Sequence, residues 1–312
     1  MNVDQTPLPL ISRTSTYGAQ SREARDLMRA AKRSGLHRVH PGAYVSEVEW
    51  QALKEHEQHV LKVLAAMPRL SRRLVVSHWS AAALHGLPLL GKPPSRVHVT
   101  DPARGTAHGS THVVRHARPL RPDEVVSIYG VTVTTLERTC VDIALTAPFA
   151  EAVAALDAAL RRGSTSASLA ATLEAHPAVR GRRGAERAIT FASPSAESAG
   201  ESLARVVLDR LGVPEPVLQK KFERNGTLIG RVDFWFPEQG VALEFDGKNK
   251  YENELYRNGR TPAQVAWDER RREVALLRLD EIRSVERTIW QELFHPEVLS
   301  MNLRAAGVPC LA

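Results

Sequence analysis

The chain is poor in the features that build disulfide frameworks, thiolate metal sites and membrane spans. Its 312 residues include two cysteines, Cys140 and Cys310, which stand alone in the sequence and form no metal-ligand pair. This usage suits a reducing cytosol. No apolar run reaches the roughly 18 residues that a membrane helix needs, and the first residues lack a basic start followed by an apolar core. We therefore expect a cytoplasmic protein with neither a signal peptide nor a membrane span.

The second part of the chain also lacks histidine, and the first part is short of acidic charge. Eleven of the 12 histidines lie before residue 191, which leaves only His295 beyond it. Residues 1–190 hold 25 Lys and Arg against 16 Asp and Glu, whereas residues 191–312 hold 17 against 19. A metal site in the second part must therefore rest on carboxylates. The basic first part is the better electrostatic match for a polyanion, and we assign no metal site to its histidines.

Sequence patterns divide the first part of the chain into four segments. Residues 1–20 are predicted to be a flexible tail. A helical stretch and two short strands around a Pro-Gly turn favour a winged helix-turn-helix domain over residues 21–60, although a generic helix–hairpin unit would give the same pattern. Alternating strand-like and helical stretches predict an α+β domain over residues 61–165. Residues 166–195 are rich in Ala, Ser, Gly and Arg, and we predict that they form a linker helix region.

Residues 196–312 predict a second domain with the order helix, three strands, helix, strand. The first helix begins at a capping box, Ser198 to Glu201, and the second begins with Thr261 and Pro262. The three strands are VLQKKF, IGRVDFWF and VALEFDG, and the last strand is predicted at ALLRLD. This order predicts an α/β domain with an αβββαβ core and a mixed sheet.

The hairpin GRVDFWFPEQGVALEFDGKNKY carries the most informative acidic residues. Apolar and polar residues alternate on both of its strands, which is the pattern of half-buried strands. A four-residue turn would place Phe236 opposite Val241, and counting back from there places Asp233 opposite Glu244. Side chains that face each other in this way lie roughly 5 Å apart, and like charges there repel. Two facing carboxylates would gain most from a bound hard cation, and oxygen ligands favour Mg²⁺ or Mn²⁺.

We predict Asp233, Glu244 and Asp246 as metal ligands and as catalytic residues; the alternative is a solvated strand pair whose charges face water. Lys248 would stabilise charge developing on a phosphate, or it is an exposed loop lysine. Asp246 would equally suit an Asp-Gly turn. Glu201 is the fifth catalytic candidate, although capping and an i,i+4 ion pair explain it without catalysis.

Several basic residues are candidate DNA phosphate contacts, because Lys and Arg neutralise the DNA backbone. The alternative is a solvated helix face. We interpret Trp235 and Trp267 as packing residues; the alternative is that they stack on nucleobases. The candidate DNA contacts are Lys32, Arg33, Arg38, Lys250, Arg257, Arg260, Arg270 and Arg271.

The second part resembles the PD-(D/E)XK nuclease superfamily, and most closely the branch related to very-short-patch-repair endonucleases. The resemblance covers about residues 195–295 and implies an Mg²⁺-dependent DNA endonuclease. The superfamily usually has Lys two residues after the Glu, whereas Asp246 stands there in this chain. The matching pieces are Glu201, Arg231-Val232-Asp233, Glu244-Phe245-Asp246-Gly247, Trp267-Asp268-Glu269-Arg270-Arg271, and Arg278 on the last predicted strand.

The first part resembles the AbiEi-type antitoxins of type IV toxin–antitoxin systems over about residues 20–165. The matching pieces are RVHPGAYV, SHWSAAALHGLP, GVTVTTLERTCVDIA and EAVAALDAAL. This resemblance implies DNA as a partner and a cognate nucleotidyltransferase-like toxin as a second one. Two functions stay open: an Mg²⁺-dependent DNA endonuclease with an antitoxin-like DNA-binding region, or a non-enzymatic DNA-binding regulator or antitoxin with a degenerate nuclease domain.

Overall fold

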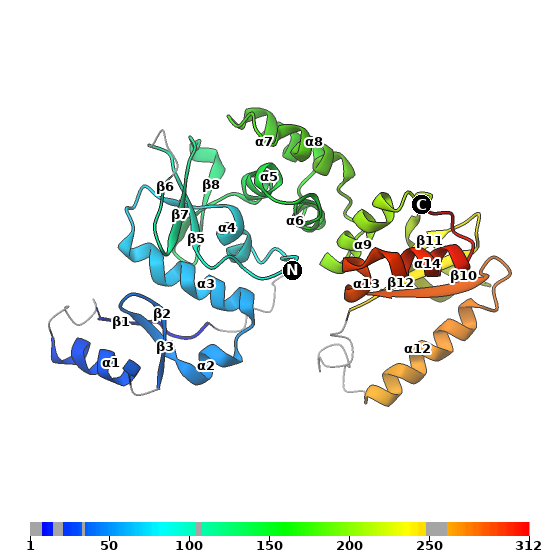
Figure 1. Cartoon of the computed structure of the whole chain (residues 1–312), viewed down its shortest axis with the longest axis horizontal. Coiled ribbons are helices and arrows are strands. Elements are labelled where there is room, and N and C mark those ends of the chain that lie inside the picture. The colour runs from blue at the N-terminus through cyan, green and yellow to red at the C-terminus, as the bar shows by residue number, and fades with distance from the viewer. Residues whose placement is uncertain (1–7, 15–20, 33–34, 104–107, 248–260, 312) are drawn as a thin grey trace. The chain divides into compact units, whose positions relative to one another are not determined.

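The chain forms two compact units, which a computed structural model describes over residues 8–14, 21–32, 35–103, 108–247 and 261–311 (Figure 1). The first unit comprises Met1–Ala155 and Gly163–Thr190, and the second comprises Leu156–Arg162 and Phe191–Ala312. The division falls within helix α6 (Phe149–Arg161). Among the described residues, no helix has the length and apolarity needed to cross a membrane.

The first unit begins with a small antiparallel sheet and three helices. Its strands lie in the order β1-β3-β2, and Gly42 turns the β2–β3 hairpin with a φ of 70°, which a residue without Cβ adopts at little cost. Val45, Trp50 and Leu61 form the local core. The elements are β1 (Ser12–Arg13), α1 (Arg22–Lys32), β2 (Leu36–His40), β3 (Ala43–Ser46), α2 (Glu47–Ala52) and α3 (Glu55–Ala66). The predicted helix and hairpin are present, and both fit the winged-helix and the generic interpretations alike.

A six-stranded mixed sheet forms the rest of the first unit. Its order is β6-β7-β5-β4-β9-β8, with β5 parallel to β7 and β4 parallel to β9. Val76, Val99 and Val133 from the central strands are fully buried beneath α3 and α4. The elements are β4 (Val75–Val76), α4 (His78–Leu84), β5 (Val97–Asp101), β6 (His108–Gly109), β7 (Val113–Ala117), β8 (Val125–Ile128), β9 (Val131–Thr134) and α5 (Leu136–Thr146).

The segment predicted as a linker helix region, residues 166–195, carries two helices, α7 (Ser166–Ala175) and α8 (Arg182–Phe191). Helix α7 packs against α5, and its Leu169 and Leu173 are buried. These two leucines are one helical turn apart, so they face the same side. Because the apolar residues are few and set among Ala and Ser, the composition resembles a linker although the segment contributes to the core.

The second unit has the predicted order of elements and a mixed sheet. The strands lie in the order β10-β11-β12-β13, with the last pair parallel and the others antiparallel. The last strand differs from the prediction: ALLRLD ends α12 and enters a turn, so Arg278 lies on no strand. The elements are α9 (Ala199–Arg210), β10 (Val217–Arg224), β11 (Thr227–Phe236), β12 (Val241–Asp246), α12 (Pro262–Leu276), β13 (Ser284–Ile289), α13 (Trp290–Phe294) and α14 (Pro296–Ala305).

Helices α9 and α12 cover opposite faces of this sheet at β12 (Figure 1). Phe245 packs against Gly200 of α9, whereas its neighbour Glu244 contacts Arg272 of α12. Successive side chains of a strand point to opposite faces, so the two helices sandwich the end of β12. The predicted acidic residues lie at this end.

Candidate functional site

The predicted hairpin register is confirmed up to the acidic residues. Phe236 pairs with Val241, and Phe234 pairs with Leu243. The next step would pair Asp233 with Glu244, but the described pairing ends before it. Here the Asp233 carboxylate accepts a hydrogen bond from the Phe245 backbone N–H at 2.9 Å. The side chain of Asp233 is therefore directed at the β12 backbone.

Asp233 and Glu201 share the side-chain amide of Gln219. Gln219 Nε2 donates to Asp233 Oδ1 at 3.1 Å and to Glu201 Oε2 at 2.9 Å. Burial raises the pKa of Glu201, and the negative charge of Asp233 raises this pKa further.

Glu201 also accepts hydrogen bonds from the Ser198 hydroxyl and the Glu197 N–H, both at 2.8 Å. The Ser198 side chain does cap α9 by accepting from the Glu201 N–H at 3.2 Å, but the Glu201 carboxylate binds the Glu197 N–H in place of the Ser198 N–H that a capping box requires. Arg205, the expected i,i+4 partner of Glu201, pairs with Asp157 at 3.0 Å.

Glu244 forms an ion pair with an arginine that the hairpin sequence alone does not reveal. Its side chain is only 5% exposed, and the two guanidinium nitrogens Nη1 and Nη2 of Arg272 lie 2.7 Å from its two oxygens. Arg272 Nη1 also donates to the Arg231 carbonyl at 3.0 Å. Only Nη2 donates a hydrogen bond to the carboxylate, at Oε2, whereas the buried Oε1 has no hydrogen-bond partner, so the contact is an ion pair with a single hydrogen bond. Arg272 therefore supplies the positive charge that a buried Glu244 requires.

Asp246 belongs to a second charged cluster, centred on Arg287 of β13. Arg287 Nη1 lies 3.2 Å from Asp246 Oδ2, and Nη2 lies 3.1 Å from Glu273 Oε2. Arg287 sits beside Glu244 in the parallel register of β12 and β13. Burial lowers the pKa of Arg287, but Asp246, Glu244 and the acidic residues of α12 outweigh it, so the pKa is raised. The arginine is held firmly as a cation.

These carboxylates do not converge as ligands of a divalent cation in this arrangement. Asp233 receives two hydrogen bonds, Glu244 pairs with Arg272, and Asp246 pairs with Arg287. The described part of the chain contains no group of three or more His, Cys, Asp or Glu side chains placed to hold a metal ion. A site for Mg²⁺ or Mn²⁺ at these carboxylates stays a prediction.

The structure describes only part of the remaining predicted set. Lys248, Lys250, Arg257, Arg260 and Arg33 lie outside the described residues, as does the Lys32 side chain. The other three candidates, Arg38 on β2 and Arg270 and Arg271 on α12, are exposed.

The two tryptophans differ in environment. Trp235 is 3% exposed, which confirms its interpretation as a packing residue. Trp267 is 65% exposed, so that interpretation was wrong for Trp267. It lies on the solvent side of α12, where the sequence offers no apolar stripe that would bury it.

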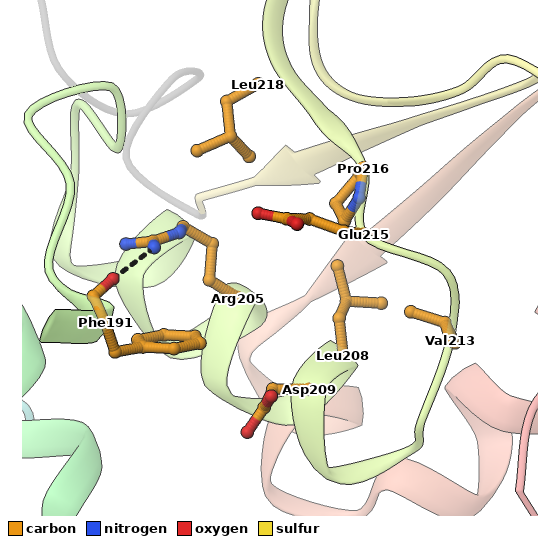
Figure 2. A pocket seen from close by; sticks show the side chains of 8 residues that line it. All are labelled: Phe191, Arg205, Leu208, Asp209, Val213, Glu215, Pro216 and Leu218. Carbon is orange, nitrogen blue, oxygen red and sulfur yellow. Dashed lines mark hydrogen bonds between the residues drawn. The ribbon is translucent and has the colours of Figure 1, made fainter. Parts of the chain in front are cut away.

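A cavity of about 330 Å³ lies beside α9 in the second unit (Figure 2). Arg205 crosses it, with Nη2 donating to the Phe191 carbonyl at 2.6 Å and its guanidinium 4.6 Å from the centroid of the Phe191 ring. None of the predicted site residues lines this cavity. Its lining residues are Phe191, Arg205, Leu208, Asp209, Val213, Glu215, Pro216 and Leu218.

Sequence reasoning missed two residues that organise the site, Gln219 and Arg287. Gln219 has a left-handed φ of 52°, a conformation uncommon for a residue other than glycine, and no sequence signal marked it. Arg287 was missed because the last strand was placed too early. Its strand, SVERTI, contains the β-branched residues Val285, Thr288 and Ile289 but no clean apolar alternation, so its signal in the sequence was weak.

Comparison with known proteins defines the class of the first unit. Residues 75–190 match the family model of the AbiEi antitoxin C-terminal domain, which spans the six-stranded sheet and helices α4 to α8. The chain therefore contains an antitoxin-type domain.

The chain is 32% identical over 222 residues to "Uncharacterized protein MT2308" of Mycobacterium tuberculosis strain CDC 1551 / Oshkosh, and the match covers 69% of this chain and 75% of the mycobacterial one. "Uncharacterized protein Rv2248" of strain ATCC 25618 / H37Rv matches with the same identity and coverage. The chain belongs to the protein family of these two relatives. The crystal structure of the Rv2827c protein from Mycobacterium tuberculosis is similar at 16% identity and a TM-score of 0.36, over 63% of this chain and 75% of that one. A likeness this remote defines neither fold nor function.

Proposed function

We propose that the chain is an antitoxin-type regulator that binds DNA through its basic first unit and acts with a nucleotidyltransferase-like toxin. The observation that carries this proposal is the antitoxin-domain match over residues 75–190. The charge distribution supports it independently, because the excess of Lys and Arg lies in residues 1–190. A basic surface binds the phosphate backbone by releasing condensed counterions.

The helix α1 and the β2–β3 hairpin offer the best DNA contact within the first unit. Arg22, Arg25 and Arg29 are exposed along α1, and Arg38 is exposed on β2. Arg22 and Arg29 share Asp26 at 3.8 Å and 3.2 Å, and such surface pairs exchange readily for phosphate because they contribute little stability. Helix and hairpin together would place several cations along one stretch of backbone.

The experiment is a fluorescence anisotropy titration of the full chain with duplex DNA from upstream of its own gene, repeated over a range of salt concentrations. We expect the logarithm of the affinity to fall linearly with the logarithm of salt concentration, by about 0.9 for each phosphate contact. Arg25→Glu with Arg38→Glu should weaken binding and flatten the slope. Arg121→Glu, which changes an exposed arginine of the same unit, is the matched control. An affinity that does not change with salt concentration would refute this DNA surface. Equal weakening of binding by the changes at Arg25, Arg38 and Arg121 would refute it too.

The toxin partnership has its own test. Co-expression of the chain with a nucleotidyltransferase-like toxin encoded beside it should restore growth that the toxin alone arrests. Rescue by residues 1–190 as well as by the full chain would place the activity in that part of the chain, which contains the antitoxin-type domain. Full toxicity in the presence of folded full-length chain would remove the toxin from the proposal.

A second candidate is hydrolysis of DNA phosphodiesters by the second unit. The order α9-β10-β11-β12-α12-β13, with Asp233 and Glu244 on adjoining strands, supports it. The arginine partners of Glu244 and Asp246 weigh against it, so it ranks second. The test is incubation of supercoiled plasmid with the chain and Mg²⁺ or Mn²⁺, beside Asp233→Ala. Nicking by the unmodified chain alone would promote this candidate, and intact plasmid with both metals would remove it.

A further inference from the structure

The antitoxin-type domain contains a cavity of about 370 Å³ that neither proposed function uses. It opens where the start of α4, the end of β7, helix α5 and the segment between α7 and α8 meet. Small-molecule sites in proteins begin at roughly this size. Its polar lining residues include His78, His116, Arg118, Asp142, His176 and Arg180. Two segments far apart in the sequence, SHWSAAALHGLP and GVTVTTLERTCVDIA, supply His78 and Asp142.

Asp142 forms the floor of this cavity and has one oxygen without a hydrogen-bond partner. The side chain is 2% exposed. Its Oδ1 accepts a hydrogen bond from Arg138 Nε at 3.0 Å and lies 3.2 Å from His176 Nε2. Its Oδ2 is buried with no hydrogen bond, and the His78 Nδ1 atom lies 3.9 Å from it. A buried carboxylate oxygen left in this state costs free energy, which a ligand with a hydroxyl or amino group would recover.

A buried ion pair with Arg138 fixes the orientation of the Asp142 carboxylate. Arg138 is 1% exposed, and its Nη1 donates to Glu124 Oε1 at 2.9 Å while its Nε holds Asp142. Both carboxylates are thereby locked to one planar guanidinium, which has a rigid donor geometry. Asp142 is thus a preorganised acceptor.

Three stacked or neighbouring histidines, His78, His98 and His116, lie on one side of Asp142. His78 is stacked on His116 with ring centroids 3.6 Å apart, and His116 Nε2 lies 3.2 Å from His98 Nδ1. Burial lowers the pKa of His98 to about 4 and that of His116 to about 3. Burial also lowers the pKa of His78, despite the neighbouring Asp142. At neutral pH the interior of the cavity therefore carries the negative charge of Asp142 and no charge from these histidines.

Two arginines stand at the opening of the cavity. Arg118 follows β7 and Arg180 precedes α8, and both are exposed residues that also line the cavity. The site is therefore bipolar, with an acceptor at the floor and two cations at the rim. A ligand that matches it has an anionic group at one end and hydroxyl donors at the other, and is large enough to span the cavity.

We propose that this cavity binds a ribonucleotide, with its phosphate held by Arg118 and Arg180 and a ribose hydroxyl donating to Asp142 Oδ2. Guanidinium groups match phosphate oxygens in a two-pronged geometry. An acidic side chain is the partner that many dinucleotide-binding proteins use for ribose hydroxyls. Inorganic phosphate would reach only the rim, and a free nucleoside would reach only the floor. The two contacts together select a nucleoside monophosphate or a larger nucleotide.

The test is isothermal titration of the full chain with AMP, GMP, CMP and UMP. Inorganic phosphate and the 2′-deoxy and 3′-deoxy forms of the tightest binder follow as probes of each end. Hydrogen bonds to charged groups are stronger than those between neutral groups, so Arg118→Ala and Arg180→Ala should each weaken binding roughly tenfold or more. Arg183→Ala changes an exposed arginine of α8 that does not line the cavity, and it should bind as the unmodified chain does. Removal of the relevant ribose hydroxyl should weaken binding by a similar factor.

Because Asp142 also supports the fold, the ribose contact is read from the deoxy ligands and not from an Asp142 variant. The absence of binding by all four nucleotides would overturn the proposal. So would equal affinity of inorganic phosphate and the tightest nucleotide, equal affinity of both deoxy forms and the ribonucleotide, or unchanged binding by both arginine variants. None of these outcomes depends on whether the chain binds DNA or a toxin, so the nucleotide site and the proposed function can fail separately.

Discussion

Replacing Arg138 with methionine should strongly destabilise the antitoxin-type domain. Arg138 lies between Glu124 and Asp142, and the side chains of all three are at most 6% exposed. Methionine keeps much of the aliphatic volume but removes the charge, so two buried carboxylates lose their partner. Breaking a buried ion pair by removing one member costs about 3–5 kcal/mol, because the remaining charge stays buried. For a unit of this size that corresponds to a fall in Tm of roughly 10 °C.

Differential scanning calorimetry of the full chain measures this fall, and hydrogen exchange of the α5 amides assigns it to the first unit. Arg121→Met is the matched control: Arg121 is an exposed arginine that pairs with Asp123 at 3.0 Å, and its loss should leave Tm unchanged. A triple variant that adds Glu124→Gln and Asp142→Asn should recover part of the lost stability, because it removes the stranded charges. A fall in Tm of less than about 2 °C for Arg138→Met, or a triple variant less stable than the single one, would refute the reasoning.

Three further predictions concern other buried groups. Burial lowers the pKa of His59 to about 4, so between pH 6.5 and 4 the unfolded chain binds a proton that the folded chain does not. Stability should fall with decreasing pH there, by about 1.4 kcal/mol per pH unit, and urea titrations of His59→Gln should show a flatter profile. Gly200→Ala would overlap the Phe245 ring and should cost about 1–3 kcal/mol. Gly184→Ala in α8 meets open space and should instead gain up to about 1 kcal/mol; thermal unfolding that ranks these two variants the other way would contradict the packing. Arg272→Ala leaves the buried Glu244 carboxylate without its cationic partner and should destabilise the second unit by about 3 kcal/mol in urea titrations. Arg271→Ala is the control, and an equal effect of the two substitutions would show that the Arg272–Glu244 pair contributes little stability.

Local patterns predicted the hairpin of the second unit well. Its register follows from apolar alternation on both sides of a short turn, and Phe236 does face Val241. These signals lie within a few residues of each other, so they need no knowledge of the rest of the chain.

Elements whose identity depends on distant contacts were predicted less well. ALLRLD has the apolar content of a strand, yet Leu276 is buried against Gly230 as the last residue of α12. The true strand, Ser284–Ile289, has few fully buried residues and is held by its parallel pairing with β12. In the same way, α7 joins the first unit through Leu169 and Leu173, which a composition count does not separate from the surrounding alanines.

The carboxylates of the hairpin show what charge repulsion alone can predict and what it cannot. Asp233 accepts hydrogen bonds from the neutral Gln219 amide and the Phe245 N–H, whereas Glu244 and Asp246 each contact an arginine. For these last two, the argument that repelling carboxylates require a positive partner holds. It fixes the sign of the partner and not its chemical identity, because a guanidinium and a divalent cation both satisfy it. Arg272 and Arg287 lie 28 and 41 positions from the carboxylates they neutralise, too far along the chain for the hairpin sequence to reveal them. Arginine is the residue best suited to this role, since it stays charged when partly buried and binds carboxylates through two nitrogens. Removing Arg272 and Arg287 is therefore the direct way to learn whether these carboxylates can accept a cation from solution.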